Sequence, residues 1–160
     1  MATTYEPIAT TTLGSDTASV TFSSISGYTD IIAVCDAWLT GTANLNFRFN
    51  SDSATNYSVT LLKGDGSSAS SYRETNTTSG RLGQGNSSSR GVYIGNFMNY
   101  SNATTYKTSI SRDSQASSQV SSWVSCWRST SAVTSISFVV DGGFSLKSGS
   151  TFTLYGIKAA

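Results

Sequence analysis

The chain has 160 residues, ten of them basic and nine acidic, so its formal net charge is +1. This length suits one domain, and we expect a single unit over residues 1–160. A balanced charge provides no long-range field for nucleic acid or a membrane surface, so neither is an expected partner. Charged residues make up only 12% of the chain, about half the usual share. Because helix surfaces are normally rich in Glu, Lys and Arg, this composition favours β-sheet.

The first predicted strands come from alternation of apolar and polar residues. A short run at 20–22 is followed by residues 29–39, which are apolar on both faces. Ile31, Ala33 and Cys35 fall on one face of this segment, and Ile32 and Val34 on the other. Such a strand lies centrally in a sheet, or its second face meets another chain.

Residues 44–50 give the clearest one-sided strand, since Leu45, Phe47 and Phe49 share a face between polar neighbours. Residues 57–61 repeat the pattern. The next stretch, residues 64–90, contains few apolar side chains. We expect it to form a long loop, and loops of that length in compact domains are usually functional or mobile.

Alternation resumes at residues 92–94, continues at 106–110 and returns at 152–154, and residues 119–128 and 133–140 are apolar on both faces. The count is nine to eleven short strands and no helix. Connections this short cannot hold helical crossovers, so the strands pair antiparallel. The sequence therefore predicts an all-β fold, an antiparallel two-sheet sandwich that is jelly-roll-like.

Catalytic and metal-binding residues are scarce. The chain has no histidine, which is the commonest general base near neutral pH. The nine carboxylates are spread through turns and strand ends, and only Asp36 lies inside an apolar strand. We expect no enzyme activity, no metal and no cofactor. Cys35 and Cys126 lie in apolar runs and are expected to be buried and reduced, with a disulfide between them as the alternative.

Aromatic residues within strands are expected to pack in the core. Tyr72 and Tyr100 lie in polar segments, so they are the better candidates for a ligand surface such as a glycan site. Pro7 suits an edge strand of a sheet. The residues that we expect at an interaction surface lie near the N-terminus, in the 64–90 segment and in one later loop: Tyr5, Pro7, Ile8, Tyr72, Arg73, Arg81, Arg90 and Tyr100.

Five segments of the sequence, which together span most of the chain, resemble those of a known family. They are IATTTLGSDTASVTFSSI, LNFRFNSDSATNYSVTLLKGDGSSAS, MNYSNATTYKTSISR, WRSTSAVTSISF and the terminal SGSTFTLYGIKAA. In order and spacing they resemble the small β-sandwich virion proteins of tailed bacteriophages, in particular those of cyanobacteria and other aquatic bacteria. Members of this family are capsid decoration (cement) proteins or modules of tail-fibre proteins.

The resemblance implies a structural protein of the virion with no catalytic residues. Because no shaft, collagen-like or coiled-coil segment accompanies the module, we expect a decoration protein that binds and stabilises the assembled head. The expected partners are the major capsid protein and further copies of the chain, as a homotrimer. The alternative is a tail-fibre or tailspike-associated adhesion module that binds host-surface glycan. The first residues are neither basic nor apolar, so no signal peptide is expected, and the protein is made in the host bacterial cytoplasm.

Overall fold

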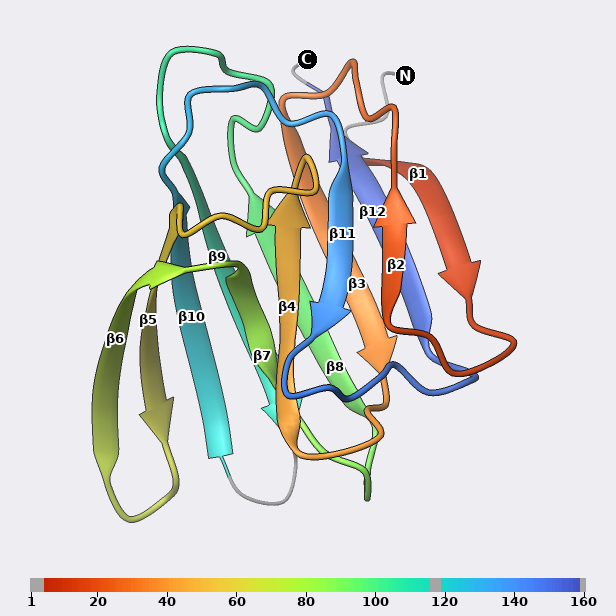
Figure 1. Cartoon of the computed structure of the whole chain (residues 1–160), viewed down its shortest axis with the longest axis vertical. Coiled ribbons are helices and arrows are strands. Elements are labelled where there is room, and N and C mark those ends of the chain that lie inside the picture. The colour runs from red at the N-terminus through yellow and green to blue at the C-terminus, as the bar shows by residue number, and fades with distance from the viewer. Residues whose placement is uncertain (1–4, 116–118, 159–160) are drawn as a thin grey trace.

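The computed structural model describes residues 5–115 and 119–158, and its regular structure there is entirely β-strand (Figure 1). The twelve strands are β1 (Tyr5–Thr12), β2 (Ser19–Phe22), β3 (Asp30–Ala37), β4 (Ala43–Phe49), β5 (Tyr57–Gly64), β6 (Ala69–Thr77), β7 (Gly80–Gly85), β8 (Gly91–Phe97), β9 (Lys107–Gln115), β10 (Gln119–Trp127), β11 (Ile136–Val140) and β12 (Thr151–Ile157).

These strands form two antiparallel sheets. The larger has eight strands in the order β1-β12-β3-β8-β9-β10-β5-β6, and the smaller has four in the order β2-β11-β4-β7. The predicted antiparallel two-sheet sandwich is confirmed. In Figure 1 the smaller sheet lies in front of the larger one, over β12, β3 and β8.

The strand order is that of a jelly roll with additions. The quartets β1-β12-β3-β8 and β2-β11-β4-β7 are the two facing sheets of a jelly roll, in which the chain changes sheet from one strand to the next at every step except from β4 to β7. Two hairpins, β5-β6 and β9-β10, are inserted between these strands, and both extend the same edge of the larger sheet. We call these four strands the extension.

The core lies between the two sheets and follows the predicted alternation. Leu45, Phe47 and Phe49 of β4 are all at most 1% exposed. The Phe47 ring centroid lies 4.9 Å from those of both Phe49 and Phe97, with tilted or edge-on geometry. Aromatic pairs at this separation stabilise a core beyond the area that they bury.

The expected long loop over residues 64–90 is wrong, because this segment contains β6 and β7. β6 is an edge strand that is exposed over most of its length, so its sequence needs no apolar face. β7 packs closely by means of glycine. A Cβ on Gly80 would lie 2.1 Å from Phe47 Cζ, and one on Gly83 would lie 2.5 Å from Asp113 Cβ. With these two strands the described part of the chain has twelve, more than the nine to eleven predicted.

The extension leaves the larger sheet wider than the smaller one. β7, the edge of the smaller sheet, lies over β9 and β10. β5 and β6 reach past it, at the left of Figure 1. The opposite face of the extension, which we call the outer face, has no described strand packed on it.

Candidate interaction surface

Four aliphatic side chains are clustered on the outer face of the extension. Val120 and Val124 of β10 are 72% and 43% exposed, Leu62 of β5 is 56% exposed, and Ile110 of β9 is 46% exposed. We call these four residues the outer-face cluster. Single exposed apolar residues are ordinary, whereas larger apolar patches mark interaction sites, so this cluster is the candidate surface.

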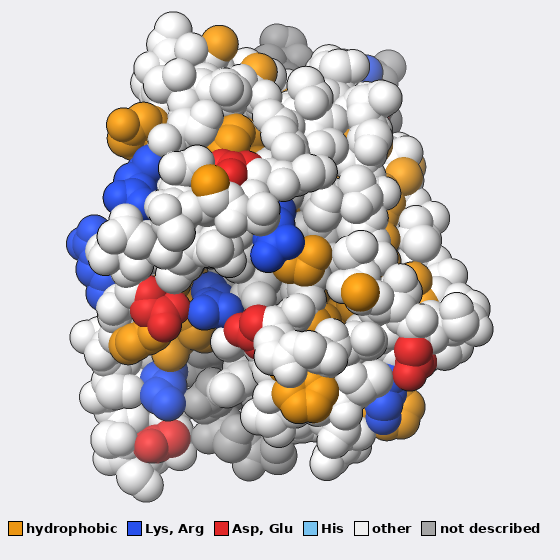
Figure 2. All heavy atoms as spheres, in the orientation of Figure 1, with side chains coloured by type: hydrophobic (Ala, Val, Ile, Leu, Met, Phe, Trp, Pro, Cys, Tyr) orange, Lys and Arg blue, Asp and Glu red, His pale blue; other side chains and the backbone are white. Residues whose placement is uncertain are grey.

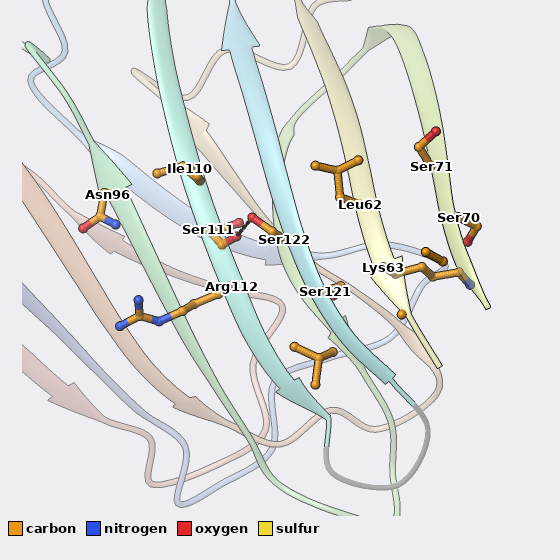
Figure 3. Close-up of a pocket in the computed structure, with 13 residues that line it drawn as sticks. Leu62, Lys63, Ser70, Ser71, Asn96, Ile110, Ser111, Arg112, Ser121 and Ser122 are labelled. Atoms are coloured by element: carbon orange, nitrogen blue, oxygen red, sulfur yellow. Dashed lines mark hydrogen bonds between the residues drawn. The ribbon is translucent and has the colours of Figure 1, made fainter. Parts of the chain in front are cut away.

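The register of the sheet explains why the four residues meet. Ser122 lies directly opposite Leu62 on one side and Arg112 on the other, and Val124 lies opposite Ile110. Val120 and Val124 flank Ser122 two residues away along β10, on the same face of the sheet. Figure 3 shows Ile110, Ser122 and Leu62 on the neighbouring strands β9, β10 and β5.

Three members of the cluster, Leu62, Ile110 and Val120, line a shallow groove of about 760 Å³, which runs from Asn96 of β8 to Ser70 and Ser71 of β6 (Figure 3). The Ser122 hydroxyl donates a hydrogen bond of 3.1 Å to the Ser111 carbonyl, so it does not interrupt the apolar surface with an unpaired group. Val92 of β8 is 43% exposed and continues the apolar character toward the middle of the sheet.

Basic side chains flank the outer-face cluster. Arg112 shares a row of the sheet with Ser122, and in Figure 3 it extends toward β8. Arg73 of β6 lies opposite Thr60, which in turn lies opposite Val124. Elsewhere charge is sparse. Figure 2 shows that the face with the four-stranded sheet consists mostly of uncharged side chains, with basic and acidic groups next to each other.

Some of the residues predicted for the interaction surface are accessible. Tyr5 is 59% exposed and Pro7 is exposed, and both lie on β1, an edge strand as Pro7 predicted. Residues 1–4 of the expected N-terminal contact lie outside the described residues. Tyr72 is 46% exposed and Arg73 is exposed, both on β6, the opposite edge of the same sheet.

Three other predicted residues are engaged within the chain. Ile8 is half-buried and packs against the core. Tyr100 is only 1% exposed, and its hydroxyl accepts a 3.3 Å hydrogen bond from the backbone N–H of Tyr28, so its predicted place on a ligand surface is wrong. The segment around Tyr100 is polar, but the Tyr100 ring points into the core.

Arg81 is the third, and it is held by three side chains. Its Nη1 lies 2.8 Å from both Asn46 Oδ1 and Asp141 Oδ2, and its Nη2 lies 3.0 Å from Glu74 Oε2. The side chain is 14% exposed. Arg81 therefore joins the edge of the smaller sheet to β6 of the larger one, and it is not a free interface residue. Arg90 is more accessible, although it is paired with Asp36 at 3.1 Å.

Asp113 is a buried carboxylate that the sequence did not point out. It accepts hydrogen bonds from the Ser121 hydroxyl at 2.6 Å and from the Gln84 backbone N–H at 3.0 Å. Trp123 Nε1 lies 3.4 Å away from it. Ser109, Ser111 and Asp113 occupy alternate positions of β9, and because all three are polar the sequence gave no apolar signal there. All three nevertheless face β7 and are buried. Asp113 thus ties β9, β10 and β7 together.

The two cysteines lie on opposite faces of the larger sheet. Cys35 is 0% exposed and points into the core from β3. Cys126 is half-buried on the outer face of β10, so its predicted full burial is wrong. β8 and β9 separate the two strands, a gap of about 14 Å at 4.8 Å per strand. Both thiols are free, since a disulfide needs Cα atoms within about 7 Å.

The described residues contain no candidate metal cluster. No group of three or more His, Cys, Asp or Glu side chains in residues 5–115 and 119–158 could hold a metal ion. The same part of the chain contains no helix long and apolar enough to cross a membrane.

Comparisons with known proteins add little. No family model matches the chain, and no curated protein matches it. One solved structure, an α-L-arabinofuranosidase with bound arabinose, aligns with 90% of this chain and 23% of its own at 15% identity and a TM-score of 0.20. The chain thus spans about a quarter of that enzyme, and a likeness this weak supports no conclusion about fold or activity.

Proposed function

We propose that the chain is a structural protein of a tailed-bacteriophage particle, which binds the assembled head shell and stabilises it. The observation that supports this most directly is the outer-face cluster, a group of exposed aliphatic side chains on three neighbouring strands. Sequence resemblance to phage virion proteins provides the kind of partner, namely the major capsid protein. The proposed self-association as a homotrimer rests on that resemblance.

The proposed mechanism is binding linkage. A protein that binds only the assembled lattice stabilises it by about 3–4 kcal/mol per site when its concentration is 100–1,000 times the dissociation constant. Many equivalent sites on a shell make the sum large. With a net charge of +1, contact depends on shape and apolar burial, so binding should vary only weakly with salt.

The test places a charge on the outer-face cluster. Val120→Lys and Leu62→Lys change exposed side chains, so both variants should fold. Each should fail to copurify with particles of the phage, and particles without the protein should break at lower temperature or under osmotic shock. Ser19→Lys is the matched control, because Ser19 is exposed on β2 of the other sheet, and it should bind normally. Full binding by Val120→Lys and Leu62→Lys would rule out this surface.

A polar hollow of about 280 Å³ favours a second candidate, a glycan-binding adhesion module. Tyr72 lines it together with Glu74, Asn44 and Trp123, and an exposed aromatic ring beside polar groups can stack on a sugar. Under this alternative, particles that lack the protein keep their robustness and lose adsorption to host cells, and Tyr72→Ala abolishes binding to host polysaccharide. Many copies per particle, or a gene beside that of the major capsid protein, would favour decoration instead.

A further inference from the structure

The two edges of the eight-stranded sheet differ in how well they are protected. β1 carries Pro7, which has no backbone N–H, and its pairing with β12 is interrupted by a bulge between Pro7 and Ala9. Both features discourage another strand from pairing there. β6 has no proline, and its register with β5 is regular from Ala69 to Thr75. β6 does carry the charged residues Arg73 and Glu74, but its backbone is free of proline and bulges from Ala69 to Thr75, so it is the less protected of the two edges.

The hairpin turn shows which backbone groups of β6 are free to pair. Asp65 N donates a 3.2 Å hydrogen bond to Ser68 O, and hydrogen-bonded pairs alternate with non-bonded pairs along an antiparallel ladder. By this alternation the Leu61–Tyr72 pair is bonded. Residues at odd positions of β6, from Ala69 to Thr75, then direct their N–H and C=O groups away from β5. No described strand pairs with that side.

We infer that β6 pairs antiparallel with β6 of a second copy of this chain, about a two-fold axis at Tyr72, and joins the two large sheets edge to edge. This contact goes beyond the proposed binding of a phage shell and uses a different surface from the outer-face cluster. It is an isologous interface, the commonest kind in homo-oligomers.

The register of the β6–β6 pair follows from the charges that it sets opposite each other and from the length of its ladder. A two-fold axis perpendicular to the sheet places a residue opposite itself, and like charges directly opposite each other are destabilising. An axis at Arg73 or Glu74 would set two like charges face to face. An axis at Tyr72 places Arg73 opposite Ser71 of the second copy and Glu74 opposite Ser70, while the two Tyr72 rings become cross-strand neighbours. An axis at Ser71 also avoids like charges, but its ladder covers residues 69–73 instead of 69–75.

The same register satisfies the free backbone groups. Tyr72 is bonded to β5, so the Tyr72–Tyr72 pair is non-bonded, and the adjacent Ser71–Arg73 pairs are hydrogen-bonded across the interface. Pairing of β6 with the protected β1 edge would build an open ribbon of chains. Pro7 and the bulge disfavour that arrangement, so the contact closes after two copies.

A symmetric cross-link tests the register. In a Cys126→Ser background, Tyr72→Cys should form a disulfide-linked dimer under mild oxidation, because Cα atoms of a non-bonded pair lie about 4.5 Å apart, within disulfide range. Thr75→Cys is the matched control on the same strand. Its two copies would lie about 20 Å apart along the ladder at ~3.3 Å per residue, so it should stay monomeric on a non-reducing gel. Equal cross-linking of both variants, or of neither, would overturn the inference.

The molar mass of the native protein provides a second readout. Light scattering at micromolar concentration should give an even multiple of 16.8 kDa, which includes a hexamer if the proposed trimer also forms. Arg73→Pro removes one outward backbone N–H without removing a hydrogen bond to β5. This variant should have half the molar mass of the unmodified protein, and its circular dichroism should stay that of a sheet protein. Arg73→Ala, which keeps the N–H, should retain the mass. A monomer or an odd multiple for the unmodified chain would contradict the pairing.

Discussion

Arg81 Nη1 lies 2.8 Å from Asp141 Oδ2, and this ion pair anchors the loop after β11 to β7. Through Glu74, at 3.0 Å, the same guanidinium also reaches β6 of the other sheet. Arg81 is thus the cation that pairs with both carboxylates, which also accept hydrogen bonds from Asn44 and Tyr72, and this arrangement leads to the first prediction.

Replacement of Arg81 by Met should destabilise the fold. The variant keeps the apolar stem and removes the charge, so Asp141 and Glu74 lose their cation. Because both carboxylates are about a third exposed, the cost should fall near the lower end of the range for such groups, about 1–2 kcal/mol. Arg81→Lys should recover part of it, since it restores the charge without the planar fork. Urea denaturation measures both, and a Met variant as stable as the parent would contradict the prediction.

Asp52 should make the protein less stable in acid. Burial raises the pKa of this carboxyl, but hydrogen bonds from Asn56, Trp127 and the Ala54 backbone outweigh it, so the pKa lies below the ordinary value of 3.8. The shortest of these bonds is 2.6 Å, from Trp127 Nε1. A carboxyl with a depressed folded pKa stabilises the fold above its unfolded pKa, and this contribution is lost as the pH falls through the folded value.

The free energy of unfolding should therefore stay level near neutral pH and fall below about pH 4. Asp52→Asn removes the titrating group, so it should lower stability at neutral pH and make the fall in acid smaller. Urea titrations near neutral pH and near about pH 3 measure this difference. If the variant and the parent lose the same unfolding free energy between the two conditions, Asp52 does not contribute to the loss of stability in acid.

The two thiols should react at different rates. Burial raises the pKa of the Cys35 thiol far above its ordinary value, and the thiolate is the reactive form. Cys126 is half-buried on the outer face. A thiol reagent should label Cys126 in the native state and Cys35 only after unfolding, as mass spectrometry of labelled peptides would show. A mass two hydrogens too low under non-reducing conditions would instead indicate a disulfide.

A methyl group should be tolerated at Gly14 and not at Gly80. A Cβ at Gly80 would lie 2.1 Å from Phe47 Cζ, inside the aromatic core, whereas one at Gly14 meets nothing within 4 Å. Gly80→Ala should cost about 1–3 kcal/mol through overpacking, and Gly14→Ala should stay within about 0.5 kcal/mol of the parent. Thermal unfolding of the pair measures the contrast, and equal stability would mean that Phe47 moves aside without cost.

The sequence by itself determined the strands that have one buried and one solvent-exposed face. Period-2 alternation in residues 44–50 is a local property, because successive side chains of a strand point to opposite faces whatever its neighbours are. It placed Leu45, Phe47 and Phe49 in the core correctly. Pro7 likewise marked an edge strand, since a residue without an N–H cannot pair on both sides. The jelly-roll-like sandwich followed from these strands and their short connections.

Tertiary structure alone decided the rest. β6 and β7 carry no alternation, since one is exposed at an edge and the other packs through glycines. The outer-face cluster exists because the strand order β9-β10-β5 brings Ile110, Val124 and Leu62 together. Residues that lie far apart in the chain become neighbours through pairing, and local periodicity contains no information about which strands pair. For the same reason the polar segment around Tyr100 gave no sign that its ring is buried.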